Sequence, residues 1–479
     1  MIAYNLLAFV DSVKTVGYVL GALLILMIMI TVHEFGHYIV GKLFKFKINE
    51  FAIGMGPAIF KRKMKSGEDF SIRALPVGGF CAFEGEDGDG EDPNCFNNKK
   101  PWQRILVLVA GATMNYLLAL VIIIISMSCY GQTVMGGGKF IEDPLYVDYC
   151  LQDDDLIVAI KDENGKKKTN IFIATDLVSS LNHKKQGDIV LVDVIRDGKQ
   201  IKNLPIKLRA DVECGNITEV SDCYKALGIG STMMLEVTEE KTFESGDGFK
   251  NGDYIKKLVV RENDLGSGEY KDYEEFLYTY EDFISILKDK KSGDHVWFWV
   301  GRTGYEASQP LSITLDESWE SVDKESREEV LAYFGVKTFN YGYYTIAEYQ
   351  KLGFLQTIGH SFGYSVRVGG MILKTLGQLL TGALGINAVG GTVTTIVTTT
   401  KIISYGFVYA LEIAAMIGVN LAVFNLLPIP ALDGSRIVFC LIEWVRGKPI
   451  SRKIEGIIHG VGLIFILGFA ILVDLLQFI

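Results

Sequence analysis

The chain has 479 residues, of which 49% are hydrophobic, and its mean hydropathy is +0.25. It is too apolar for an average soluble enzyme, and its 22% of charged residues is too high for a protein made only of membrane helices. We therefore expect membrane helices combined with soluble domains. The net charge of −10 argues against nucleic-acid binding. The seven cysteines form no Cys-x-x-Cys pair of the kind that binds zinc.

The first element is an apolar run at residues 16–42, which is long enough to cross a bilayer. It contains the sequence His33-Glu34-Phe35-Gly36-His37. A spacing of four residues puts both imidazoles on one helix face, where they can share a zinc ion, and a glutamate between them is the usual general base. Ionisable groups at membrane depth are costly and usually functional. The pattern predicts a zinc protease whose active site lies in the membrane.

Short β-type runs follow at residues 48–53, 58–63, 70–75 and 79–83, and glycines separate them. We predict a small β-meander against the cytoplasmic face of the membrane. The acidic stretch at residues 84–92 indicates no particular chemistry, and we expect a solvated linker there.

Three further runs are long enough to span a bilayer, at residues 105–130, 404–427 and 454–478. The segment at residues 354–384 carries His360, Arg367 and Lys374 and fits an amphipathic helix at the membrane interface better. Lysine and arginine gather between spans one and two and between spans three and four, which should therefore be cytoplasmic. Both termini and the middle segment should then be extracytoplasmic.

The middle segment repeats itself. Residues 187–198 and 293–304 share the frame Gly-Asp-x-Val-x-x-x-Val-x-Arg-x-Gly. The upstream residues that match at the same offset are Asp176, Leu177 and Leu181 in one copy and Asp282, Phe283 and Leu287 in the other. Each copy resembles a PDZ domain, which binds an extended chain end by adding a strand to a sheet. Two β-rich spacers without ligands are an equally weighted alternative, and whether Cys214 pairs with Cys223 stays open.

A catalytic zinc needs a third protein ligand and an open position for water. The acidic candidates in or beside the other spans are Glu412, Asp433, Glu443 and Asp474. Glu412 and Asp474 lie near the outer ends of their spans, and Glu443 has no special local geometry. Asp433 lies at the right depth, after two prolines, Pro428 and Pro430, that end the helix. Irregular backbone at that depth is tolerated only around a cavity or inside protein, which favours Asp433 as the ligand.

The His-Glu-x-x-His sequence and the sequence Asn-Leu-Leu-Pro-Ile-Pro-Ala-Leu-Asp-Gly at residues 425–434 together resemble the site-2 protease family of intramembrane zinc metalloproteases. With the two PDZ-like units, the chain is similar over nearly its whole length to the bacterial RseP/RasP-like branch. The resemblance implies one zinc ion per chain, bound by His33, His37 and Asp433, with Glu34 as the base.

The resemblance also implies a way of holding substrate. The residues expected to contact an unwound substrate are Asn425, Asn420, Pro428 and Pro430, and the β-meander would pair with it as an added strand. The chain departs from the family pattern at residues 111–112, 391–392 and 434–435, none of which is an expected zinc ligand.

The expected fold is a polytopic α-helical membrane protein of about four transmembrane helices with a membrane-associated β-meander and two extracytoplasmic PDZ-like α+β domains. The expected boundaries are 1–44 for the first span, 45–103 for the meander and loop, 104–130 for the second span, 131–210 and 211–320 for the PDZ-like domains, 321–403 for a linker and the interfacial helix, 404–453 for the third span and a cytoplasmic loop, and 454–479 for the fourth span.

The expected activity is zinc-dependent endopeptidase cleavage of single-span membrane proteins inside the plasma membrane, with the active site near the cytoplasmic side. The resemblance suggests substrates such as anti-sigma factors or remnant signal peptides, already trimmed outside by a site-1-type protease. The alternatives are a catalytically silent membrane scaffold that binds partners through the PDZ-like domains, and, less well, a transporter. An intact Glu34 argues against the scaffold, because a binding module needs no base.

Overall fold

The computed structural model describes residues 2–86, 92–138, 140–141, 145–146, 149–212, 220–237, 241–250, 252–261, 272–276, 279–301, 309–343, 345–385 and 389–478. The chain divides into two compact units. Residues 1–132 and 349–479 form the first unit, and residues 133–348 form the second. The chain therefore leaves the helical unit once and returns to it.

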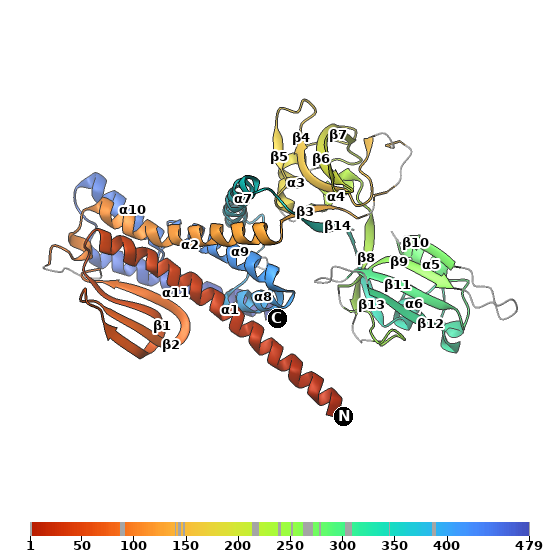
Figure 1. The fold of residues 1–479 in the computed structure, drawn as a ribbon, viewed down its shortest axis with the longest axis horizontal. Helices are drawn as coiled ribbons and strands as arrows, with labels where there is room; N and C mark the ends of the chain where they lie inside the picture. Colours follow the sequence, from red (N-terminus) through yellow and green to blue (C-terminus); the bar gives the residue numbers. More distant parts are fainter. Residues whose placement is uncertain are drawn as a thin grey trace. The chain divides into compact units, whose positions relative to one another are not determined.

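Four helices of the first unit are long and apolar enough to cross a membrane: α1 (Ile2–Leu43), α2 (Pro101–Cys129), α9 (Phe407–Leu426) and α11 (Arg452–Phe478). Helix α2 packs against both α1 and α9 (Figure 1). The four spans expected from the sequence are confirmed within the described residues. Their exposed faces carry large apolar side chains, as expected where a helix meets lipid.

Three more helices belong to this unit: α7 (Phe354–Leu380), α8 (Thr392–Ser404) and α10 (Asp433–Arg446). From Thr357 to Val368 the buried residues of α7 recur every three or four positions, so that one face packs on the unit. This agrees with the predicted amphipathic helix. Residues 433–446, within the predicted cytoplasmic connection after the third span, form the helix α10, which ends at Gly447, whose φ of +66° suits a helix C-terminus.

The predicted β-meander consists of two long strands, β1 (Ile48–Lys63) and β2 (Asp69–Phe83), rather than four short ones. Each strand stays continuous through glycines of positive φ, namely Gly54, Gly56 and Gly78. The strands curl there, so that Ile53 pairs with both Ile72 and Gly79. The short 3-10 helix η1 (Phe96–Asn98) follows the acidic loop, and Phe96 packs with Phe46 and Phe83 beneath the sheet.

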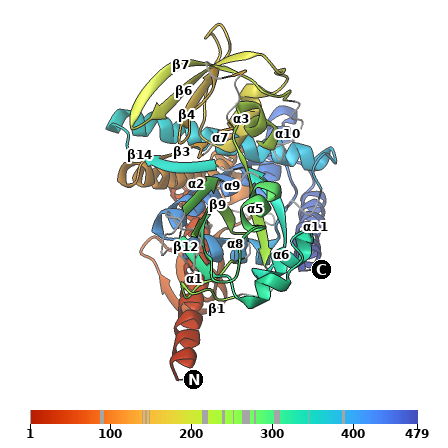
Figure 2. The ribbon, with the colours of Figure 1, turned by 90° about the vertical axis from the view of Figure 1, so that its right-hand side faces the viewer.

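The second unit contains two α+β bodies. The first has the strand order β14-β3-β4-β6-β7, with β5 beside β4. Its elements are β3 (Gln132–Gly137), β4 (Leu156–Lys161), β5 (Lys168–Asn170), α3 (Ala174–Leu181), β6 (Ile189–Arg196), β7 (Lys199–Lys207), α4 (Val220–Leu227) and β14 (Thr345–Gln350). Figure 2 shows β4, β6 and β7 side by side.

The second body has the strand order β12-β11-β9-β8-β13, with β10 beside β9. Its elements are β8 (Ser231–Val237), β9 (Tyr254–Arg261), β10 (Asp272–Phe276), α5 (Tyr280–Leu287), β11 (His295–Gly301), β12 (Gln309–Thr314), the 3-10 helix η4 (Glu317–Ser321), α6 (Arg327–Tyr333) and β13 (Val336–Tyr343).

The internal repeat has the same local structure in both bodies. Each Gly-Asp pair makes the same turn: Asp188 accepts from the Lys185 N–H and Asp294 from the Lys291 N–H, both at 2.9 Å. A helix precedes each turn and a strand follows it, as predicted. Residues 302–304 of the second copy, and Cys214, lie outside the described residues.

The predicted boundaries at 210/211 and 320/321 are too early. The first apolar core includes Val212, Leu227 and Ile229, and the second includes Val330 and Phe339. Each body therefore includes a last helix and a last strand that the sequence pattern alone did not assign to it.

Candidate metal centre

The His-Glu-x-x-His sequence lies within α1, and both imidazoles lie against Gly111 of α2. His33 and His37 are 8% and 7% exposed, and their rings meet edge to face at 4.7 Å. Gly36 allows the close approach, because a Cβ there would lie 2.4 Å from the Ala110 carbonyl oxygen of α2. The two helices therefore pack tightly where the histidines are held.

The predicted irregular segment separates α9, which ends at Leu426, from α10, which begins at Asp433. The Leu432 N–H donates to the Ile429 carbonyl at 3.1 Å and closes a turn. Gly434 packs directly on the segment, because a Cβ there would lie 2.1 Å from the Leu427 carbonyl oxygen. This turn places Asp433 at the first residue of α10, 400 residues from His33 in the sequence.

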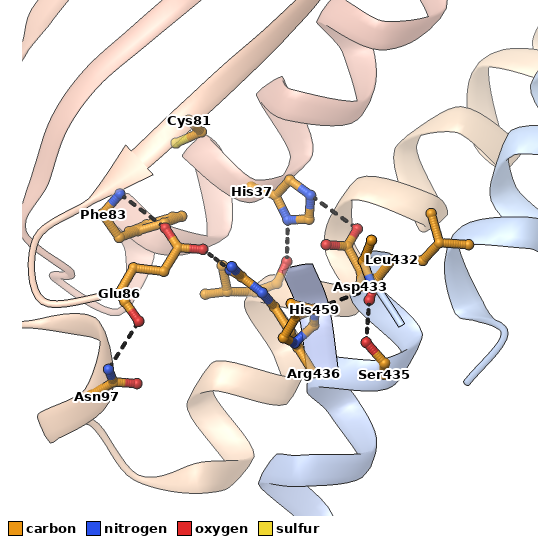
Figure 3. A network of polar contacts seen from close by, with 12 residues as sticks. His37, Cys81, Phe83, Glu86, Asn97, Leu432, Asp433, Ser435, Arg436 and His459 are labelled. Carbon is orange, nitrogen blue, oxygen red and sulfur yellow. Dashed lines mark hydrogen bonds and ion pairs between the residues drawn. The ribbon is translucent and has the colours of Figure 1, made fainter. Parts of the chain in front are cut away.

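Three ligand atoms converge in the described part of the chain: Nε2 of His33, Nε2 of His37 and one carboxylate oxygen of Asp433. The carboxylate Oδ2 lies 3.0 Å from His33 Nε2 and 3.4 Å from His37 Nε2, and the two nitrogens are 3.1 Å apart. Figure 3 shows His37 and Asp433 directed at one another. Ligands about 2.0–2.1 Å from a tetrahedral zinc lie roughly 3.3 Å from each other. The donor set therefore fits zinc in both chemistry and spacing.

The far side of each imidazole also suits a metal ligand. His37 Nδ1 lies 2.8 Å from the Val107 carbonyl oxygen, which can only accept, so Nδ1 carries the proton and Nε2 has its lone pair available. His33 Nδ1 lies 3.5 Å from the buried amide of Asn115. Asn115 Oδ1 is buried without a hydrogen-bond partner, and a turned amide would present it to His33 Nδ1–H.

Glu34 lies beside this cluster and is held by the β-hairpin. Its Oε2 accepts from the Cys81 N–H of β2 at 3.0 Å, and Gly79 packs against its Cγ. A cavity of about 260 Å³ joins the carboxylate to the ligand atoms. Its lining residues are Ile30, His33, Glu34, Asn115, Leu421, Asn425, Ala431, Leu432 and Asp433.

The Cys81 thiol is not part of the three-residue cluster found among the described residues. Burial raises the pKa of this thiol well above its ordinary value, and the charges of Glu34 and Glu68 add to the effect. The sulfur is therefore a neutral thiol at physiological pH, and a metal or an electrophile needs the thiolate.

Of the four residues predicted to contact substrate, one lines the cavity. Asn425 lines the cavity, whereas Asn420 is exposed and is not among its lining residues. Pro428 is exposed, and Pro430 packs against Gly462 of α11.

The rejected zinc-ligand candidates Glu443 and Asp474 have other partners. Glu443 lies 2.5 Å from the Arg104 guanidinium, and Asp474 accepts from the first backbone N–H groups of α8.

Several contacts could not be predicted from the sequence. Glu86, in the acidic stretch expected to be a solvated linker, pairs with Arg436 one turn after Asp433, and its backbone carbonyl accepts from Asn97 (Figure 3). Arg104 is 2% exposed and joins α2 to α10 through Glu443. For Arg104 and Asn115 of α2, the sequence offered one signal, because arginine and asparagine are rare in an apolar helix.

A family model described as Peptidase family M50 matches residues 21–469. The chain belongs to peptidase family M50. This is the site-2 protease family, so the predicted family membership is confirmed, and the chain is a zinc metalloendopeptidase of a multi-pass membrane type.

Relatives of similar length agree with this assignment. A protease named eep from Enterococcus faecalis is 27% identical, covering 93% of this chain and 95% of its own length. A Regulator of sigma E protease from Haemophilus influenzae is 25% identical, covering 96% and 98%. A protein of Thermotoga maritima named as a zinc metalloprotease is 24% identical, covering 93% and 95%.

Proposed function

We propose that this M50 peptidase cuts single-span membrane proteins within their membrane segment, with zinc held by His33, His37 and Asp433 and with Glu34 as general base. The observation that carries the proposal is the meeting of three lone-pair donors beside a carboxylate in one cavity. Each donor comes from a membrane-spanning helix or from the segment directly after one.

Zinc, Glu34 and Val107 have separate roles in the proposed reaction. When bound, zinc polarises the scissile carbonyl and lowers the pKa of a bound water to about 7. Glu34 lines the same cavity and is restrained by the Cys81 N–H, so it can accept the proton of the attacking water and pass it to the leaving amine. Val107 keeps the proton of His37 on Nδ1, away from the cavity.

A helical substrate must be opened before it can be cut, because its carbonyls are occupied by its own hydrogen bonds. The end of β2, at residues 79–83, pairs with β1 along one edge, and its other edge is where Cys81 reaches Glu34. We infer that an unwound substrate adds a strand along this edge, with the Asn425 amide replacing a lost backbone partner.

The sigma-regulator name of one relative supports substrates such as membrane-anchored anti-sigma factors, and remnant signal peptides fit the same site. We place both termini and the two α+β bodies outside the cell, where an upstream protease would trim the substrate first. The bodies would act as PDZ-like readers of the new chain end or as a size filter. Strand β13 supports the first role, because it ends its sheet and borders a cavity of about 770 Å³ that is lined by Arg327 and Lys337.

The role of the second unit is tested by its removal. Gly131 and Gln350 are adjacent, since a Cβ on Gly131 would lie 2.6 Å from the Gln350 carbonyl oxygen, so a short linker can replace residues 133–348. The shortened protein should cut untrimmed substrates that the full chain rejects. Unchanged selectivity would argue against both the filter and the reader.

The catalytic proposal is tested with purified wild type, Glu34→Gln, Asp433→Ala and the control Glu163→Gln, which changes an exposed turn. Zinc per chain is measured together with cleavage of a tagged single-span substrate. Wild type, Glu34→Gln and the control should hold about one zinc ion, and only wild type and the control should cut within the span. Wild type that binds zinc but cuts none of a panel of trimmed substrates would favour the scaffold alternative.

A further inference from the structure

Helix α11 contacts the segment that carries Asp433 through a histidine. The backbone N–H of Ala431 donates to Nδ1 of His459 at 3.2 Å. Ala431 has a φ of +79°, a left-handed conformation that a residue with a Cβ rarely adopts without an external restraint. The centroid of the His459 ring lies 5.7 Å from that of the Phe439 ring on α10.

One turn further along α11, a glycine makes a second contact with the same segment. Gly462 is buried, and a Cβ added to it would lie 2.3 Å from the Cβ of Pro430 and 2.7 Å from its carbonyl carbon. Gly460, only two residues away, is exposed and would meet nothing within 4 Å. The close approach is therefore confined to the face of α11 that touches the turn before Asp433.

We propose that His459 and Gly462 are positioning residues that hold the turn at residues 430–431 and thereby direct the Asp433 carboxylate at the two histidines. The inference rests on the proposed role of Asp433 as a zinc ligand. His459 fixes the backbone by accepting one hydrogen bond, and Gly462 lets α11 approach closely enough for that bond to form. Neither side chain contacts substrate or metal.

The consequence for metal binding follows from the geometry. His33 and His37 are fixed by α1 and α2, whereas Asp433 reaches them from a turn of only six residues between α9 and α10. If the turn relaxes, the carboxylate leaves a site whose other two ligands stay in place. Removing a partner that orients a ligand typically weakens metal binding about 10- to 100-fold.

The experiment compares four variants of the full-length protein in detergent: His459→Ala, His459→Asn, Gly462→Ala and Gly460→Ala. The asparagine amide oxygen can occupy the place of imidazole Nδ1 and keep the acceptor. The two glycine variants add the same methyl group to the same helix. Zinc affinity is measured by competition with a chromogenic chelator, and the unfolding temperature of the zinc-free protein is measured in parallel.

His459→Ala and Gly462→Ala should bind zinc about tenfold more weakly or worse, while His459→Asn and Gly460→Ala stay near wild type. Equal zinc affinity in the two glycine variants, or in the two His459 variants, overturns the proposal. A lower unfolding temperature of the zinc-free protein with unchanged zinc affinity also overturns it, because α11 would then only stabilise the fold. An Asp433→Ala variant with wild-type zinc affinity would instead show that the assigned ligand set is wrong.

Discussion

Glu68 ties the β-hairpin to α1, and its removal should loosen the wall of the active site. The Glu68 carboxylate is 2% exposed and accepts from Tyr38 at 2.7 Å, Lys42 at 2.8 Å and Ser66 at 2.8 Å. Tyr38 and Lys42 follow His37 on α1, so the tether and the metal site share one helix. We expect Glu68→Gln to release the β-hairpin from α1 without changing the proposed zinc ligands His33, His37 and Asp433.

The size of the effect follows from the carboxyl group's pKa. Burial alone would raise this pKa, but the hydrogen bonds from Lys42, Tyr38 and Ser66 outweigh burial and lower it from 4.5 to about 2. At 1.36 kcal/mol per pKa unit, this corresponds to about 3 kcal/mol. The Lys42 side chain is 32% exposed, and solvent weakens its share, so we take about 2–3 kcal/mol. The open hairpin should then be populated about 30- to 160-fold more in the variant.

Hydrogen exchange measured by mass spectrometry on the β1 and β2 amides tests this expectation. Exchange should accelerate in Glu68→Gln at pH 7, and not in the control Glu84→Gln, whose ion pair with Lys47 is exposed. Because the folded pKa is lowered, the stabilisation is complete above about pH 4.5 and is lost as the pH falls toward 2. After correction for intrinsic amide exchange, the difference in exchange rate between wild type and Glu68→Gln should shrink as the pH falls from about 4.5 toward 2. Equal exchange in both proteins at pH 7 would refute the reasoning.

Three further changes test the supports of the site. Asn115→Leu should weaken zinc binding at least about tenfold in chelator competition, because His33 loses the partner that orients its ring. Arg104→Met should destabilise the protein by about 3–5 kcal/mol by leaving Glu443 unpaired, and adding Glu443→Leu should restore much of the unfolding temperature. Gly36→Ala should lower both zinc affinity and stability, since its Cβ meets the α2 backbone, whereas Gly17→Ala, which meets nothing within 4 Å, should do neither.

Local patterns predicted the elements that their own residues specify. Four apolar runs became four candidate spans, and the spacing of His33 and His37 put both on one face of α1. Asp433 was predictable because two prolines and its depth leave few acidic residues that can reach the histidines. The repeated Gly-Asp turns were predictable because each depends on a carboxylate that accepts from a backbone N–H three residues earlier.

Contacts between distant segments were not predictable, because nothing in the local pattern encodes them. The glycine bends of β1 and β2 marked breaks, and the pairing shifts register there, yet each strand continues on both sides of its bends. The domain boundaries failed for the same reason, since α4 was assigned to the second domain and α6 to the linker, whereas their apolar faces lie in the first and the second core. Glu86 looked solvated because its partner Arg436 lies 350 residues away.

The proposed metal centre depends on residues that are not among its proposed ligands. A histidine pair on one helix is rigid by itself, but a third ligand from a separate turn must be brought in and kept there against its own conformational freedom. Two contacts do so: α2 holds α10 through Arg104 and Glu443, and α11 holds the turn through His459. Each contact joins one segment to another, so the site can exist only in the assembled helical unit.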